Sequence, residues 1–268
     1  MSLFFAGLHE RAPLHASHRG GAALAPENTL VAFREALGTW RTDLLELDVQ
    51  LTRDDVVVVC HDATVDRCTD GRGDVRDHTL AELQRLDAGF HFSRDGGRTF
   101  PFRGKGVRIP TLREVLETFG APALRFNIDV KRAIPGIEAR VAEELRRASA
   151  LSRVCVGTVD DAQAARLVEL LPECAHFYPR DALVSFVLAV RAGETPPEDA
   201  RFTVLDVPLR WNGMTIVDDA LIAAARAHGK WVNVWTVDDP DDMRALIALG
   251  VGGIMTDRPD LLRQVLGG

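Results

Sequence analysis

The chain has 268 residues, an ordinary length for a single (β/α)₈ barrel. Hydrophobic residues make up 46% of the sequence and charged residues 26%, a balance that suits a large core beneath a hydrated surface. The formal net charge of −7 argues against a nucleic-acid partner, because such a partner is held by a basic face.

The first predicted strand, Leu14–Ser17, leads into the motif His18-Arg19-Gly20, and a helix is predicted to open at Pro26-Glu27-Asn28-Thr29. The second predicted strand, Leu44–Thr52, carries an acid at every second position of an apolar run. Side chains alternate between the two faces of a strand, so Glu46 and Asp48 project together. Two hard oxygen donors on one face predict a site for Mg²⁺ or Ca²⁺.

A short link separates this strand from the valine run 56–59, which leads into His61-Asp62. The link is too short for a parallel crossover and predicts a hairpin, whose second arm returns His61 toward Glu46 and Asp48. Residues 63–110 show no barrel period and are interpreted as an insertion. A short helix near 79–86 is expected there, with Thr79 as its N-cap and Glu82 as the capping-box partner.

Helices and strands alternate regularly from residue 111 onward. Further strands are predicted at 123–131, 153–158, 174–179, 203–209, 231–237 and 252–257. Further helices are predicted at 112–119, 137–148, 161–170, 182–191, 218–227 and 240–249. With the hairpin arm set aside, eight strands are each followed by a helix. This pattern predicts a TIM (β/α)₈ barrel, a single domain over 1–268, with a small insertion at about 63–110 after the second barrel strand.

Active sites of such barrels lie at the C-terminal ends of the strands, where the polar residues of this chain gather. Asn127, Asp129 and Lys131 share the inward face of the third barrel strand. Asp129 can therefore offer a third oxygen to a metal, and Lys131 can meet an anionic ligand. Trp235 either looks into the barrel mouth or fills the upper layer of the barrel. An interior ion-pair network without a ligand is the alternative, but three acids and two histidines at one mouth favour a site.

Seven ordered motifs between residues 18 and 259 resemble those of the glycerophosphodiester phosphodiesterases: His18-Arg19-Gly20, Pro26-Glu27-Asn28-Thr29, Glu46-Leu47-Asp48-Val49, His61-Asp62, Asn127-Ile128-Asp129-Val130-Lys131, Trp235-Thr236-Val237 and Thr256-Asp257-Arg258-Pro259. The resemblance implies a TIM barrel with a small insertion after the second strand. It also implies hydrolysis of glycerophosphodiesters to glycerol 3-phosphate and an alcohol, with a bound Ca²⁺ or Mg²⁺. One position departs from the family, which usually has Glu where this chain has Asp129. The shorter carboxylate reaches less far and predicts a closer metal, a bridging water or a different metal preference.

Phosphodiester hydrolysis needs charge neutralisation, a base and an acid. A metal held by Glu46, Asp48 and Asp129 would bind a phosphate oxygen. Arg19 and Lys131 would bind other phosphate oxygens, and Trp235 the glycerol or a cationic head group. His18 and His61 form the expected acid–base pair, with the two roles open between them. Glu27 and Asn28 are expected to orient His18 or Arg19 or only to open the helix, and Asp257 to hold Arg19 or Lys131.

Two other functions stay open. A lysophospholipase D-like activity on acylated substrates would need an apolar groove, which Phe90, Phe92, Phe100 and Phe102 would line unless they form the insertion's own core. A barrel that binds phosphodiesters without turnover has no need of both histidines. We expect a small-molecule glycerophosphodiester substrate, no nucleic acid and no stable membrane insertion, and leave the oligomeric state open. No signal peptide or run of ~20 apolar residues is evident, and the cysteines form no C-x-x-C pair, so a cytoplasmic location is expected.

Overall fold

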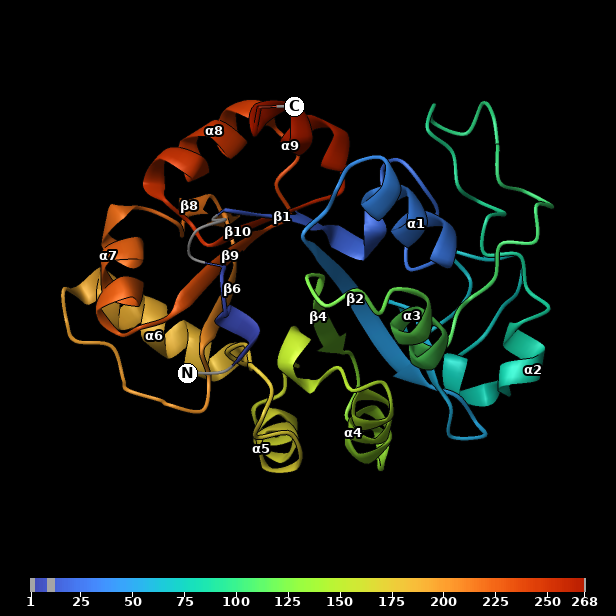
Figure 1. Ribbon diagram of the computed structural model, residues 1–268, viewed down its shortest axis with the longest axis horizontal. Coiled ribbons are helices and arrows are strands. Elements are labelled where there is room, and N and C mark those ends of the chain that lie inside the picture. The colour runs from blue at the N-terminus through green and yellow to red at the C-terminus, as the bar shows by residue number, and fades with distance from the viewer. Residues whose placement is uncertain (1–2, 9–12, 268) are drawn as a thin grey trace.

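Parallel strands form a barrel wall surrounded by helices in the computed structural model, which describes residues 3–8 and 13–267 (Figure 1). Residues 1–2, 9–12 and 268, which belong to the predicted single domain, lie outside the described residues. Within the described chain, seven parallel strands are hydrogen-bonded in the order β5-β4-β2-β1-β10-β9-β6. They are β1 (Leu14–Ser17), β2 (Leu44–Leu51), β4 (Arg125–Val130), β5 (Val154–Gly157), β6 (Val204–Pro208), β9 (Trp231–Trp235) and β10 (Gly253–Thr256).

The strand predicted at 174–179 is not a regular strand, and this expectation is corrected. The segment lies between β5 and β6 and pairs with each through one isolated bridge, Cys155↔Ala175 and Phe177↔Val204. Backbone bonds on both sides still close the ring, from Val156 N–H to Ala175 O (2.9 Å) and from Tyr178 N–H to Val204 O (2.9 Å). Pro179 has no N–H with which to extend the ladder, and a helix begins immediately after it.

The predicted hairpin is present, because β3 (Val57–Val59) pairs antiparallel with β2 through Val49↔Val59 and Leu51↔Val57. Residues 60–110 follow it on one side of the barrel (Figure 1) and include η3 (Val75–Asp77) and α2 (Leu80–Leu83). The expected Thr79–Glu82 capping box opens α2. This insertion packs around a small core of its own side chains and one residue of β3, Val58. The insertion residues in this core are Cys60, Val65, Val75, Leu83, Ala88, Val107 and Ile109.

The outer helices are α1 (Leu30–Gly38), α3 (Leu112–Thr118), α4 (Ile137–Arg147), α5 (Asp161–Leu170), α6 (Arg180–Ala192), α7 (Asp219–Ala227), α8 (Pro240–Leu249) and α9 (Pro259–Val265). Short 3₁₀ turns lie at η1 (Leu3–Phe5), η2 (His18–Gly20) and η4 (Leu151–Arg153), and β7 (Arg210–Trp211) pairs with β8 (Met214–Thr215) in a small hairpin. The odd-numbered apolar residues of β2 join the helices in one core cluster. None of the helices in the described part of the chain has the length and apolarity that a membrane crossing requires.

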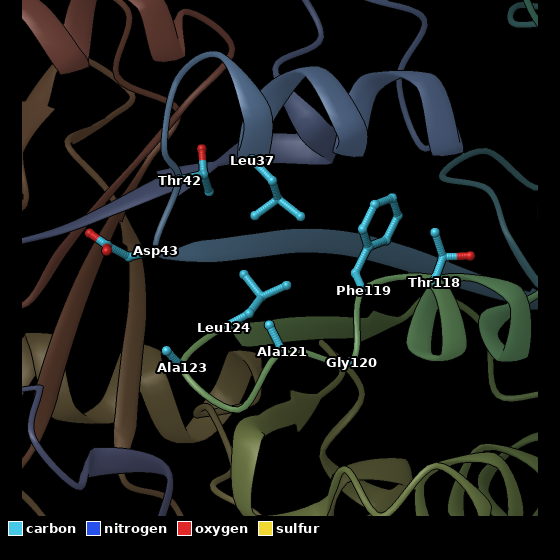
Figure 2. Close-up of a pocket in the computed structure, with 9 residues that line it drawn as sticks. All are labelled: Leu37, Thr42, Asp43, Thr118, Phe119, Gly120, Ala121, Ala123 and Leu124. Atoms are coloured by element: carbon cyan, nitrogen blue, oxygen red, sulfur yellow. The ribbon is translucent and has the colours of Figure 1, made fainter.

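The N-terminal ends of the strands are closed by apolar packing. Phe4 and Phe5 of η1 join Leu14, Leu44 and Trp231 in one buried cluster. A hollow of about 330 Å³ lies at this same end, lined by Leu37, Thr42, Asp43, Thr118, Phe119, Gly120, Ala121, Ala123 and Leu124 (Figure 2). Its lining residues precede the first residues of β2 and β4. The hollow is therefore at the opposite end of these strands from the predicted site.

Candidate active site

The register between β2 and β4 sets the positions of the three predicted metal-binding acids. Glu46 lies opposite Asn127, and Asp48 lies opposite Asp129. The residues between them face outward into the helix layer, so Glu46, Asp48 and Asp129 share the inner face of the barrel. Lys131 follows on the same face, with its backbone N–H donating to Val49 O at 3.2 Å.

The ammonium group of Lys131 bridges two of these acids. Its Nζ lies 2.8 Å from Asp48 Oδ1 and 2.6 Å from Asp129 Oδ2. Asp48 is fully buried, and its other oxygen accepts from Asn28 Nδ2 at 2.8 Å and lies 3.3 Å from Arg19 Nε. Burial disfavours the charged form of Asp48, but Lys131 and Arg19 outweigh it and hold the pKa of this carboxyl below its usual value. Burial prevails at Asp129 and raises its pKa.

Glu46 has a less favourable environment for a negative charge. Its Oε2 accepts the backbone N–H of Arg19 at 2.9 Å and lies 3.9 Å from His18 Nε2. Arg19 adopts a left-handed backbone conformation with φ 52°, and this turn brings its N–H to Glu46. Burial and the neighbouring Asp48 raise the pKa of Glu46 to about 8. An additional cation beside Glu46 would therefore stabilise its ionised form.

The donor set of these three acids suits a hard divalent cation. All three offer carboxylate oxygens, and Asp129 Oδ1 is buried without a hydrogen-bond partner. Among the residues that the structure describes, however, no three acidic, histidine or cysteine side chains already form a metal-binding group. Lys131 Nζ contacts both Asp48 and Asp129 instead. Metal binding by Glu46, Asp48 and Asp129 thus stays a prediction.

Both predicted catalytic histidines are held at Nδ1 by a carboxylate. His18 Nδ1 lies 2.7 Å from Asp257 Oδ1, and His61 Nδ1 lies 2.6 Å from Asp62 Oδ1. Such a contact orients an imidazole and leaves Nε2 for proton transfer. Burial lowers the pKa of His18, but Glu46 and Asp257 outweigh it, so the pKa is raised above its usual value.

The residues expected to orient the site have partly different partners. Glu27 Oε1 accepts from Arg19 Nη1 at 3.0 Å, as expected. The Asn28 side chain contacts Asp48 instead of His18 or Arg19, and only its backbone N–H donates to Arg19 O, at 2.9 Å. The expectation that Asp257 holds Arg19 or Lys131 is wrong.

Strand register explains the actual partner of Asp257. In the β1–β10 pair, Ser17 lies opposite Thr256. The next residues along the two strands are His18 and Asp257, so the imidazole ring and the carboxylate lie side by side.

Trp235 is 38% exposed at the end of β9, which disfavours the interpretation that it fills a buried layer of the barrel. Its contact with substrate stays a prediction.

A polar layer beneath the site includes a residue that the sequence interpretation missed. Asp206 of β6 accepts from Asn127 Nδ2 at 2.6 Å and from Asn233 Nδ2 at 2.8 Å. Burial raises the pKa of Asp206 to about 6. The run 204–208 places this single acid among Val204, Leu205 and Val207, and an acid inside an apolar predicted strand was the available signal.

A family model described as the glycerophosphoryl diester phosphodiesterase family matches residues 18–261. The chain belongs to this family. A glycerophosphodiester phosphodiesterase of Caldanaerobacter subterraneus subsp. tengcongensis is 34% identical over 249 residues, which cover 92% of this chain and 94% of that protein. A lysophospholipase D of Mus musculus is 28% identical, over 94% of this chain and 85% of that protein.

The fold is shared with solved members of the family. The crystal structure of a glycerophosphoryl diester phosphodiesterase domain from Mycobacterium tuberculosis matches with a TM-score of 0.84 at 23% identity, and the match covers 94% of this chain and 98% of that chain. The predictions of the family, of a TIM barrel and of an enzyme of this class are confirmed.

Proposed function

We propose that the chain hydrolyses glycerophosphodiesters to glycerol 3-phosphate and an alcohol at the C-terminal mouth of the barrel, with a divalent metal and a two-histidine acid–base pair. The observation that carries the proposal is the placement of His18 and His61, each held at Nδ1 by a carboxylate, beside the acids on β2 and β4. His61 lies within electrostatic range of both Asp48 and Asp129. A relative with 34% identity carries the name of this activity.

The chain's own cations would bind the phosphate. Arg19 offers a planar fork suited to two phosphate oxygens, and Lys131 offers a point charge. Lys131 contacts Asp48 and Asp129, and on substrate binding it would exchange one of these contacts for a phosphate oxygen. The exposed ring of Trp235 at the end of β9 would lie against the glycerol or the alcohol group.

The two imidazoles would divide the proton transfers. One removes a proton from the attacking hydroxyl or water, and the other protonates the departing alcohol oxygen. Glu46, Asp48 and Asp129 would hold Mg²⁺ or Ca²⁺ through their carboxylate oxygens. When bound, such a cation supplies charge neutralisation at a phosphate oxygen. The expected cytoplasmic location belongs to the proposal and stays a prediction.

Hydrolysis of acylated substrates is the second candidate, since a lysophospholipase D is among the relatives. The phenylalanines of the insertion do not favour it. Phe102 packs on the insertion core and on Phe92, with ring centroids 5.4 Å apart. The guanidinium of Arg103 lies 4.2 Å from the Phe90 ring centroid and 3.8 Å from that of Phe100. These rings therefore pack within the insertion, which favours an unacylated substrate.

The test is a substrate panel followed by phosphorus NMR. Matched glycerophosphodiesters with and without an acyl chain are incubated with the protein, first in excess EDTA and then with Mg²⁺ or Ca²⁺ restored. We expect glycerol 3-phosphate from the unacylated substrates and restored turnover after metal addition. Turnover of acylated substrates alone would favour the second candidate. Full activity in EDTA would contradict the metal site, and binding without turnover would contradict the enzyme.

A further inference from the structure

The side chain of Arg67, a residue of the insertion, contacts two carboxylates, Glu27 and Asp62. Among the described residues, no other insertion side chain contacts both of them. Arg67 Nη1 donates to Glu27 Oε2 at 2.6 Å, and its Nη2 donates to Glu27 Oε1 at 2.8 Å. Its Nε donates to Asp62 Oδ2 at 2.7 Å, and Nη2 also reaches Asp62 Oδ1 at 3.3 Å. The guanidinium thus joins the loop after β1 to the loop after β3.

Each of these carboxylates also contacts one residue of the proposed machinery. Glu27 accepts from the Arg19 guanidinium, and Asp62 contacts the His61 ring. The result is a continuous chain of charged contacts in the order Arg19, Glu27, Arg67, Asp62 and His61. Arg19 is the expected phosphate ligand, and His61 is one of the two expected proton-transfer groups.

We propose that Arg67 is a positioning residue that couples the phosphate-binding Arg19 to the catalytic His61 by holding Glu27 and Asp62 in one fixed arrangement. The inference rests on the proposed function and deepens it. A planar guanidinium suits this task, because its donors form a rigid fork that holds two carboxylates at once. A lysine ammonium is a point charge on a flexible stem and lacks this geometry.

The base of the Arg67 side chain is itself firmly placed. Arg67 lies in the turn between Val65 and Thr69, both fully buried. Thr69 donates to Val65 O through its backbone N–H at 3.0 Å and through its hydroxyl at 2.9 Å. The Val65 N–H donates to Gly73 O at 3.0 Å. The Arg67 side chain therefore extends from a hydrogen-bonded turn with buried flanking residues. From this fixed base it can restrict the positions of the Glu27 and Asp62 carboxylates.

The charge state of the network agrees with this role. Hydrogen bonds from Arg67 lower the pKa of Asp62 to about 2. Burial disfavours the charged form of Glu27, but Arg67 and Arg19 outweigh it and lower the pKa of this carboxyl as well. Both carboxylates are therefore ionised at neutral pH. Glu27 contacts Arg19 as well as Arg67, and Asp62 contacts His61 as well as Arg67.

The decisive experiment compares Arg67→Met with Arg94→Met. Arg94 is a matched control, because it also joins the insertion to the barrel, through Leu24 O and Glu35, and is 48% exposed against 49% for Arg67. We expect Arg67→Met to lower kcat and to raise KM for a glycerophosphodiester, each by ~10- to 100-fold, as small misplacements of catalytic groups do. Arg94→Met should leave both within about twofold. Arg67→Lys should recover part of the loss.

Substitutions at Glu27 and Asp62 test separately the contact with Arg19 and the contact with His61. Glu27→Gln should act mainly on KM through Arg19, and Asp62→Asn mainly on kcat through His61. Adding Arg67→Met to the Glu27→Gln/Asp62→Asn double variant should change either constant less than about threefold, because residues of one network are not additive. Full additivity would contradict the coupling. A purely structural role would lower the melting temperature and the active fraction but leave KM unchanged.

An NMR measurement tests the same inference without requiring substrate turnover. Long-range ¹H–¹⁵N spectra report the ring nitrogens of His61, which we expect to shift in Arg67→Met and Arg67→Lys and to stay in place in Arg94→Met. Unchanged His61 signals together with unchanged kcat and KM would overturn the inference. If the unsubstituted protein turns over no phosphodiester, the proposed function fails. The ring signals then decide separately whether Arg67 orients His61.

Discussion

Cation binding at the barrel mouth should release a proton from Glu46. This side chain is 7% exposed, and the backbone N–H of Arg19 donates to it at 2.9 Å. Burial and the neighbouring Asp48 raise its pKa from the model-compound value of 4.5 to about 8. With that pKa, about 0.9 of the molecules carry the proton at about pH 7, and about 0.1 carry it at about pH 9.

A divalent cation requires the carboxylate form of its ligand, so binding displaces the proton. We therefore expect about 0.9 proton released per cation at about pH 7 and about 0.1 at about pH 9. The sign follows from the raised pKa: the free protein favours protonated Glu46 below about pH 8, and protons compete with the metal there. Metal affinity should accordingly rise with pH up to about pH 8 and then level off.

Isothermal titration calorimetry measures this proton directly. Mg²⁺ or Ca²⁺ is titrated in several buffers of different ionisation enthalpy. Released protons bind to the buffer, so the observed enthalpy falls as the ionisation enthalpy rises, and the negative of this slope is the number of protons released per cation. Glu46→Gln should bind the metal more weakly, with a slope near zero. His18 lies 3.9 Å from Glu46, so His18→Gln is a second control that should retain the release. Tight metal binding with an enthalpy slope of zero at about pH 7 would refute the conclusion that Glu46 is protonated at that pH. The absence of metal binding would refute the proposed metal site.

Three further results are expected. His18→Ala and His61→Ala should each lower kcat by ~10²–10⁴, measured by release of glycerol 3-phosphate, and near-native turnover in either variant would assign that histidine a structural role. Asp129→Asn should severely weaken metal binding in calorimetry, whereas Asp129→Glu should keep activity with an altered Ca²⁺/Mg²⁺ preference; unchanged affinity in Asp129→Asn would exclude this residue as a ligand. Gly20→Ala should reduce the free energy of unfolding by about 1–3 kcal/mol in urea titrations, because Gly20 has φ +84° and an added Cβ would lie 2.8 Å from Ala32 Cβ; an unchanged midpoint would contradict this packing.

Local periodicity was sufficient to predict most elements and the faces of the strands. The alternation in β2 and β4 places Glu46, Asp48 and Asp129 on one face, because the backbone of a strand turns successive side chains to opposite sides. The three-residue link 53–55 predicted the β2–β3 hairpin, and the Thr79 cap predicted the start of α2. The ordered motifs were enough to predict the family. The irregular pairing of 174–178 was not predictable, since it depends on two neighbouring strands at once.

Only the tertiary structure decided which charged groups meet. Asp257 contacts His18 across 239 positions of the chain, because closing the barrel pairs β1 with β10. Lys131 reaches Asp48 on the adjacent strand, and Arg67 of the insertion reaches both Glu27 and Asp62. The sequence determines the face on which a side chain lies through backbone geometry within one strand. Its partner on another element depends on the register and closure of the whole barrel, which no local pattern encodes.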